Sequence, residues 1–372
     1  MPRLAQGNLL QGSPGNKAIS PRAAPDKSEK HLFPAKWRDN VAGMRSGAAG
    51  HKWSAIARAG DRWERIAVAT AALLILVGPA WARDANATAL PSSTISYYEH
   101  SASPGALYRQ GTAAGRAGAQ GIVILDFGRP ADNGIASGTL AYNGAFIPFA
   151  AIAKGMEFYI AAYYRHAPPY TTLNVALGTN DSCGTSQPCG AVVACGCPDE
   201  PSDFSTWGGE LAATVEAVDA WVTQYRAEHG YTDVVRVIAA DDAEPAYDPG
   251  YQNTYDVLAG YAAAVGGPFP TMVDYGSADP DFWTEAELLQ VAYGFRPDVP
   301  MPQIYYPDQA AQWAQLLRYA KASRGAVLDI YGVLTTGAGT NSPAAAYADM
   351  LGAASEVTNQ SSIPWLSTIR LI

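Results

Sequence analysis

The chain has 372 residues and a formal net charge of −9, with 34 Asp and Glu against 25 Lys and Arg. The charge is uneven, because residues 1–82 carry 12 Lys and Arg against 5 Asp and Glu, whereas residues 83–372 carry 13 against 29. A domain this acidic repels nucleic-acid phosphates and anionic lipid headgroups, so the composition argues against both as partners.

Residues 1–82 are predicted to be a leader with a secretory signal. The apolar run 66–78 follows a basic flank and precedes Pro79-Ala80-Trp81-Ala82, which has the small residues of a cleavage site. The run is shorter than the about 20 residues of a membrane-spanning helix. We therefore expect a secreted, extracellular protein with no stable membrane insertion after cleavage, and an uncleaved anchor is the alternative.

All four cysteines fall in one expected Cys-rich loop, residues 182–205, at positions Cys183, Cys189, Cys195 and Cys197. In an exported chain an even, local set favours disulfides, here two that staple a surface loop. A Cys195–Cys197 bond is sterically poor, so each of these two is expected to bond Cys183 or Cys189. A zinc site with four thiolates is the alternative, although the usual Cys-x2-Cys pairs are missing.

Strands and helices are predicted to alternate from Gly121 onward, after a linker at residues 83–118. Short apolar runs predict strands at 122–125, 173–177, 234–239, 271–273, 302–304, 326–330 and 365–372. Apolar residues at three- and four-residue steps predict the helices between them. Gly230 is expected to end one helix, and the capping box Thr284-x-x-Glu287 to start another.

This alternation predicts an α/β fold, a (β/α) TIM-like barrel over residues 119–372 with seven or eight parallel strands. The eighth strand is expected within residues 94–110 or 157–163. An open doubly wound sheet is the alternative, but the sequence has no Gly-x-Gly-x-x-Gly after a strand and no phosphate-binding loop. In a barrel the carboxyl ends of the strands meet at one face, where the active site lies.

Acidic and aromatic residues follow the predicted strands, so a barrel would gather them in one cup. The catalytic candidates are Asp126, Asp242, Glu244 and Asp274, and the substrate-binding candidates are Asn180, Tyr275, Tyr305, Tyr306 and Tyr331. Such a set suits glycoside hydrolysis, in which one carboxylic acid protonates the leaving oxygen and a carboxylate acts as nucleophile or base. Crowded carboxylates raise one another's pKa, which keeps one protonated near neutral pH. The tyrosines and Trp207 would stack on sugar rings.

The most specific feature is Asp242-Ala-Glu244. Residues i and i+2 of an extended strand face the same side, so both carboxylates are expected to face the cup. The alternative is an Asx-type turn before Pro245. Asp126 has a structural alternative as an acceptor of backbone N–H groups in the next loop.

Other chemistries have less support in the sequence. His100, His166 and His229 lack the spacing of metal ligands, so neither a metal nor a cofactor is expected. The sequence also has no Gly-x-Ser-x-Gly elbow and no Asp-x-Asp-x-Asp-Gly calcium loop.

The stretches LDFG, with Asp126, and AADDAEP, with Asp242 and Glu244, resemble the family-25 glycoside hydrolases, lysozyme-type barrels that cleave peptidoglycan. The resemblance implies that Glu244 is the general acid, that Asp242 and Asp126 are its charged partners, and that Asp274 joins them. A closer resemblance, over roughly residues 120–335, is to secreted bacterial barrel proteins of unassigned function that share GTND, DAEPAYD, YGSAD and PQIY. The chain departs from family 25 in reading Asp-Phe-Gly where Asp-x-Ser is expected, and in its Cys-rich loop.

The expected function is therefore a secreted, monomeric glycosidase-like barrel that acts on peptidoglycan or another cell-wall or extracellular polysaccharide. The runner-up is a catalytically silent barrel that binds a glycan or a surface partner. A purely structural exported domain is the third reading.

Overall fold

The structure is a computed structural model that describes residues 90–180, 200–245, 251–267, 269–295, 298–337 and 339–372. Its main feature is one sheet of eight parallel strands in the order β10-β11-β1-β2-β6-β7-β8-β9. The strands are β1 (Ser93–Tyr98), β2 (Gly121–Asp126), β6 (Thr172–Asn180), β7 (Val234–Asp242), β8 (Met272–Asp274), β9 (Asp298–Pro300), β10 (Gly332–Thr336) and β11 (Trp365–Leu371).

The two edges of this sheet meet just after β9. Gln303 forms a parallel bridge with Leu334 of β10. The Ile304 N–H donates to the Leu334 carbonyl at 2.8 Å, and the Leu334 N–H donates to the Pro302 carbonyl at 2.9 Å. The sheet is therefore curled, with neighbouring strands following one another in the chain, and the prediction of a TIM-like α/β fold is confirmed at this level.

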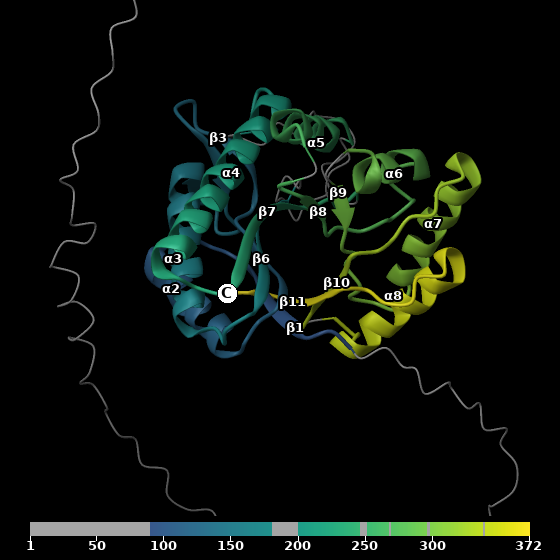
Figure 1. The fold of residues 1–372 in the computed structure, drawn as a ribbon. Coiled ribbons are helices and arrows are strands. Elements are labelled where there is room, and N and C mark those ends of the chain that lie inside the picture. Colours follow the sequence, from purple (N-terminus) through teal and green to yellow (C-terminus); the bar gives the residue numbers. More distant parts are fainter. Residues whose placement is uncertain (1–89, 181–199, 246–250, 268, 296–297, 338) are drawn as a thin grey trace, which may run out of the picture. The chain divides into compact units, whose positions relative to one another are not determined.

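Helices connect the strands and lie outside the curled sheet (Figure 1). They are α2 (Pro104–Arg116), α3 (Phe149–His166), α4 (Phe204–His229), α5 (Tyr251–Val265), α6 (Glu285–Tyr293), α7 (Gln309–Arg324) and α8 (Pro343–Thr358). Two predicted end points are confirmed: Thr284 and Glu287 form the capping box of α6, and Gly230 ends α4 in the left-handed conformation.

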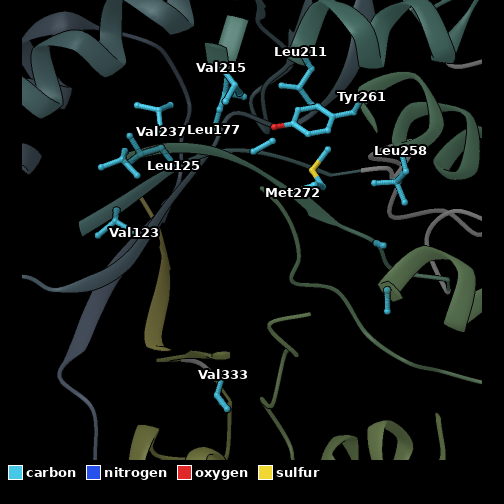
Figure 2. Packing of buried hydrophobic residues seen from close by; sticks show 14 of the residues in the cluster. Val123, Leu125, Leu177, Leu211, Val215, Val237, Leu258, Tyr261, Met272 and Val333 are labelled. Atoms are coloured by element: carbon cyan, nitrogen blue, oxygen red, sulfur yellow. The ribbon is translucent and has the colours of Figure 1, made fainter. Parts of the chain in front are cut away.

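Side chains of each strand alternate between two apolar layers. The outer layer joins strand residues such as Leu177 and Val237 to the helices, and Figure 2 shows Leu211 of α4 beside Tyr261 of α5 in this layer. The inner layer fills the space enclosed by the sheet and holds strand residues such as Ile124, Ala176, Ile238, Val273, Met301 and Ile369. This alternation decides which polar residue at a strand end faces the interior.

The expected linker at residues 83–118 is wrong from Ser93 onward. Residues 93–98 form β1, in the middle of the sheet, and α2 follows at Pro104–Arg116. The eighth strand is therefore the first in the chain, and it lies, apart from Ser93, in the first of the two segments where it was expected, residues 94–110. Its polar residues obscured it in the sequence: Ser96 faces the interior and shares a hydrogen bond of 2.7 Å with Ser367 of β11, so the position is buried without being apolar.

The predicted strand at residues 326–330 is also wrong, because β10 begins at Gly332. The backbone of Ile330 bonds to a side chain and not to a strand: its N–H donates to Gln360 Oε1 at 2.9 Å, and its carbonyl accepts from Gln360 Nε2 at 2.6 Å. A second difference is a small antiparallel sheet between β2 and α3, formed by β3 (Arg129–Asp132), β4 (Ser137–Leu140) and β5 (Phe146–Pro148).

Two sequence predictions lie outside the described residues. All four cysteines, and with them the proposed disulfides and the zinc alternative, fall within residues 181–199, and the apolar run 66–78 falls within residues 1–89. None of the helices in the described ranges has the length and continuous apolar character that a bilayer crossing requires.

The close packing of α4 against α5 can be tested by substitutions at two glycines of α4. A Cβ added to Gly208 would meet the backbone carbonyl of Val257, whereas one added to Gly209 finds its nearest neighbour, Ala264, at 3.9 Å. We expect Gly208→Ala to lower the free energy of unfolding by about 2 kcal/mol or more, because backbone must shift.

Gly209→Ala is the matched control, expected to be neutral or stabilising by up to about 1 kcal/mol through helix propensity. Urea unfolding of both variants measures the difference. Equal stabilities would contradict this packing of α4 on α5.

Candidate functional site at the carboxyl ends of the strands

The carboxyl ends of β2 and β7 bring the predicted acids together. Ile122 and Ile124 of β2 and Ile238 and Ala240 of β7 belong to the inner apolar layer. Two residues further along each strand, Asp126 and Asp242 therefore continue the inward-facing rows. Both are buried and accept tyrosine hydroxyls, Asp126 from Tyr142 and Tyr275 and Asp242 from Tyr98.

Asp126 is held by three donors. Its Oδ1 accepts the Gly128 N–H at 2.7 Å, and its Oδ2 accepts the hydroxyls of Tyr142 and Tyr275, each at 2.7 Å. Burial raises the pKa of Asp126 above its ordinary value, and the bonds from Tyr275, Tyr142 and Gly128 act in the opposite direction. The structural alternative, in which Asp126 accepts a backbone N–H of the following loop, is thus confirmed. Two tyrosine hydroxyls are further donors to the same carboxylate.

Asp242 and Glu244 share one partner, the side chain of Gln303. Gln303 Nε2 donates to Asp242 Oδ1, and a hydrogen bond from Gln303 also reaches the Glu244 carboxylate. Burial raises the pKa of Glu244 to about 7, Gln303 opposes the rise, and the charge of Asp126 adds to it. The expectation that positions i and i+2 face the same side stays a prediction, which this common partner supports.

Three tyrosines lie around these carboxyls. The Tyr98 hydroxyl donates to Asp242 Oδ2 at 3.3 Å and lies 3.2 Å from the Tyr305 hydroxyl. The rings of Tyr98 and Tyr142 meet edge to face, with centroids 4.9 Å apart. Tyr142 is 41% exposed, and Tyr98, Tyr305 and Glu244 are partly exposed, so these groups form the accessible part of the site.

Asn180, at the end of β6, supports this ring of tyrosines. Its Nδ2 donates to the Tyr142 hydroxyl at 2.6 Å, and Tyr142 in turn donates to Asp126. Asn180 is only 8% exposed. Its predicted contact with a substrate stays a prediction, and in this structure it orients a tyrosine.

Asp274 does not join the other acids. Val273 and Tyr275 of the β8 region belong to the inner apolar layer, so Asp274 between them faces the outer, helical layer. Burial raises the pKa of Asp274 to about 7. Burial also raises the pKa of Asp298, and the charges of Asp274 and Asp241 add to that rise. The expectation that Asp274 faces the cup is therefore wrong, because Asp274 lies one position away from the residues of this strand that face the interior.

Two predicted aromatic contacts are also corrected. Tyr331 precedes β10, so it lies at the amino-terminal end of a parallel strand, whereas the site lies at the carboxyl-terminal ends. It was expected at the site because it follows the predicted strand 326–330, which does not form. Trp207 is buried in the outer layer, where its Nε1 donates to the Gly138 carbonyl at 2.9 Å. Tyr306 is 49% exposed and lies next to Tyr305, whereas Tyr275 is fully buried beneath the site.

Sequence reasoning missed Tyr98, Tyr142 and Gln303. Tyr98 ends a strand hidden in the expected linker, and Tyr142 lies between β4 and β5 of the unpredicted small sheet. Gln303 lies in a stretch that was predicted as a strand, and alternation along that stretch could have shown that it faces the interior with Met301 and Tyr305.

No metal centre or known relative guides the interpretation of this site. Within the described residues, no group of three or more His, Cys, Asp or Glu side chains is arranged to hold a metal ion. Comparison with protein-family models, with curated proteins and with solved structures finds no match. The function is therefore argued from the geometry of the site.

The buried acids predict how stability depends on pH. In the folded chain burial raises the pKa of Glu99, Glu244 and Asp274 to about 7, above their ordinary values near 4. The folded state thus favours the protonated forms, so their contribution is complete below the unfolded pKa and is lost as pH rises through 7. Asp274→Asn, which cannot ionise, should reduce the stability difference between pH 5 and pH 8 by on the order of 2 kcal/mol.

The measurement is urea unfolding of parent and variant at both pH values. Asp279→Asn is the control, because Asp279 likewise accepts a backbone N–H two residues ahead but is not buried. An unchanged pH dependence in Asp274→Asn would contradict the buried, protonated state of this carboxyl.

Proposed function

We propose that this chain is a secreted glycoside-hydrolase-like protein that cleaves a cell-wall or extracellular polysaccharide, with Glu244 as the general acid. The observation that carries the proposal is the pair Asp242 and Glu244, joined by Gln303 beside a group of partly exposed tyrosines. Because Gln303 bonds to both carboxyls, the two acids are close neighbours. Glycosidases likewise act with two neighbouring carboxyl groups.

Glu244 has the properties of a general acid. Its pKa of about 7 leaves a large protonated fraction at neutral pH, as donation to a leaving oxygen requires. Its partial exposure distinguishes it from Asp126, which is fully buried. Among the acids that the structure describes at this end of the sheet, Glu244 is thus the one proposed to keep its proton and to reach a ligand.

Asp242 is the proposed carboxylate partner, as nucleophile or as the base that activates water. Asp126, which the family resemblance gave a similar charged role, takes a different one in this proposal. Because both of its oxygens accept hydrogen bonds, Asp126 holds Tyr142 and Tyr275 and adds negative charge that favours the protonated form of Glu244. It is a positioning residue and not a group that attacks a sugar.

The substrate in this proposal is a glycan because the accessible groups suit sugars. Tyr98, Tyr142 and Tyr305 offer ring surfaces and hydroxyls beside the acids, and sugar rings pack on aromatic faces while their hydroxyls bond to polar groups. Secretion, cleavage of the leader after Ala82, two disulfides within 182–205, a monomeric state and action without a cofactor complete the proposal.

A catalytically silent, glycan-binding barrel is the second candidate, favoured by one observation. Asp242 ends β7, Glu244 follows two residues later, and the two share an amide. Asp126, at the end of β2, already accepts hydrogen bonds from three donors. A ligand could therefore bind beside the tyrosines without a carboxylate positioned for attack. Binding without turnover is the outcome that separates this candidate from the enzyme.

The test is hydrolysis of peptidoglycan and a panel of polysaccharides by parent protein and by Glu244→Gln and Asp242→Asn. We expect release of reducing ends by the parent and a loss of at least about 100-fold in each variant, because each removes a group that takes part in the transition state. Glu356→Gln, an exposed glutamate on α8, should act like the parent.

Calorimetric titration with the same glycans gives a readout that is independent of turnover. Binding by the parent with no cleavage would establish the silent barrel. Cleavage that persists in Glu244→Gln would remove Glu244 from the mechanism.

A further inference from the structure

Gln303 occupies the position where the curled sheet joins its own edge. Its backbone N–H donates to the Gly276 carbonyl at 3.1 Å after β8, and it forms the bridge to Leu334 of β10. Its side chain is 1% exposed and points to the interior between Met301 and Tyr305. The backbone on both sides therefore fixes where this amide lies.

The orientation of the amide is also determined. A glutamine amide has two N–H donors on one nitrogen and an acceptor oxygen on the other side. Gln303 Nε2 bonds to Asp242 and to Glu244, and Gln303 Oε1 has no hydrogen-bond partner. A flipped amide would turn that oxygen toward the Asp242 carboxylate, and two acceptors repel each other.

We propose that Gln303 is the positioning residue of the site, which holds Asp242 and Glu244 as a pair and decides which of the two carries the proton. The inference rests on the proposed function for the meaning of the pair, but the pairing itself can be measured without turnover. Gln303 acts through the two acids and does not touch the bond that is cleaved.

The direction of the effect follows from the donors. Because an N–H donor stabilises a carboxylate more than a carboxylic acid, loss of the Gln303 amide should raise the pKa of Glu244. Asp126, at the end of β2, and Tyr305, after β9, are titratable groups that act on Glu244 or feel its charge. Asp242 of β7 shares Gln303 with it, and Tyr98 and Tyr142 face Asp242.

Two substitutions separate the hydrogen bonds from the volume of the side chain. Gln303→Met keeps the length of the chain and removes both donors. Gln303→Glu keeps the shape and replaces the amide with a third carboxyl, which adds like charge beside Glu244. Each is expected to raise the Glu244 pKa by about one unit or more, with the larger shift in Gln303→Glu.

The experiment is a carbon-13 NMR titration of protein labelled at the glutamate carboxyl carbons, with the Glu244 resonance assigned by its loss in Glu244→Gln. In parallel, the pH profile of hydrolysis is recorded, where loss of the protonated acid limits activity at high pH. Removal of the donors should move both the NMR midpoint and this limb of the profile to higher pH.

Gln315→Met is the matched control, because the Gln315 amide also bonds to a glutamate, Glu285, at 3.2 Å but lies exposed on α7. Circular dichroism and thermal unfolding confirm that each variant is folded. If Gln303→Met does not fold, the isosteric Gln303→Glu carries the test alone.

The outcomes distinguish the two proposals. A raised Glu244 midpoint without any hydrolysis supports the role of Gln303 and rejects the enzyme. Hydrolysis that depends on Glu244, with a Glu244 midpoint that stays within about 0.3 units of the parent in both variants, supports the enzyme and overturns the role of Gln303.

Discussion

The alternation of side chains along a closed set of parallel strands is the constraint on which the whole site depends. One position along a strand separates a carboxyl inside the barrel from a carboxyl against the helices. Asp242 faces the interior, while Asp241, its neighbour on β7, lies in the outer layer with Asp274 of β8. An acid therefore belongs to the site only if it lies near the carboxyl end of a strand and its side chain also faces the interior. The bridge between the two edges of the sheet then brings Gln303 within reach of β7.

The carboxyls at the interior end are differentiated by what bonds to them. Asp126 receives a backbone N–H and two phenols, Asp242 receives a phenol and an amide, and Glu244 shares that amide while remaining partly exposed. Three acids of similar chemistry therefore acquire different roles through burial and donors. Tyr98 and Tyr142 connect these roles, because each donates to an acid and also presents its ring toward the accessible side.

The sequence predicted the parts of this arrangement that depend on local pattern. Continuous apolar strands gave the fold class, and the spacing of Asp242 and Glu244 gave the interior pair. The rest depends on tertiary context. Asp274 follows a strand as convincingly as Asp126 does, but a three-residue strand gives no periodicity from which to read its parity. Tyr142 reaches the site between β4 and β5 of a small sheet whose strands have only three or four residues, too few to show a periodic pattern in the sequence. The backbone of Ile330, in the apolar run before Tyr331, bonds to the Gln360 side chain and not to a neighbouring strand.

The central claim is that a sugar lies against Glu244 at the carboxyl ends of the strands. A crystal structure of Glu244→Gln protein soaked with cell-wall oligosaccharides tests it most directly. We expect a sugar ring packed on Tyr98, Tyr142 or Tyr305, with a glycosidic oxygen about 3 Å from the introduced amide. Oligosaccharide bound at another face, with this end of the barrel left empty at saturating concentration, would contradict it.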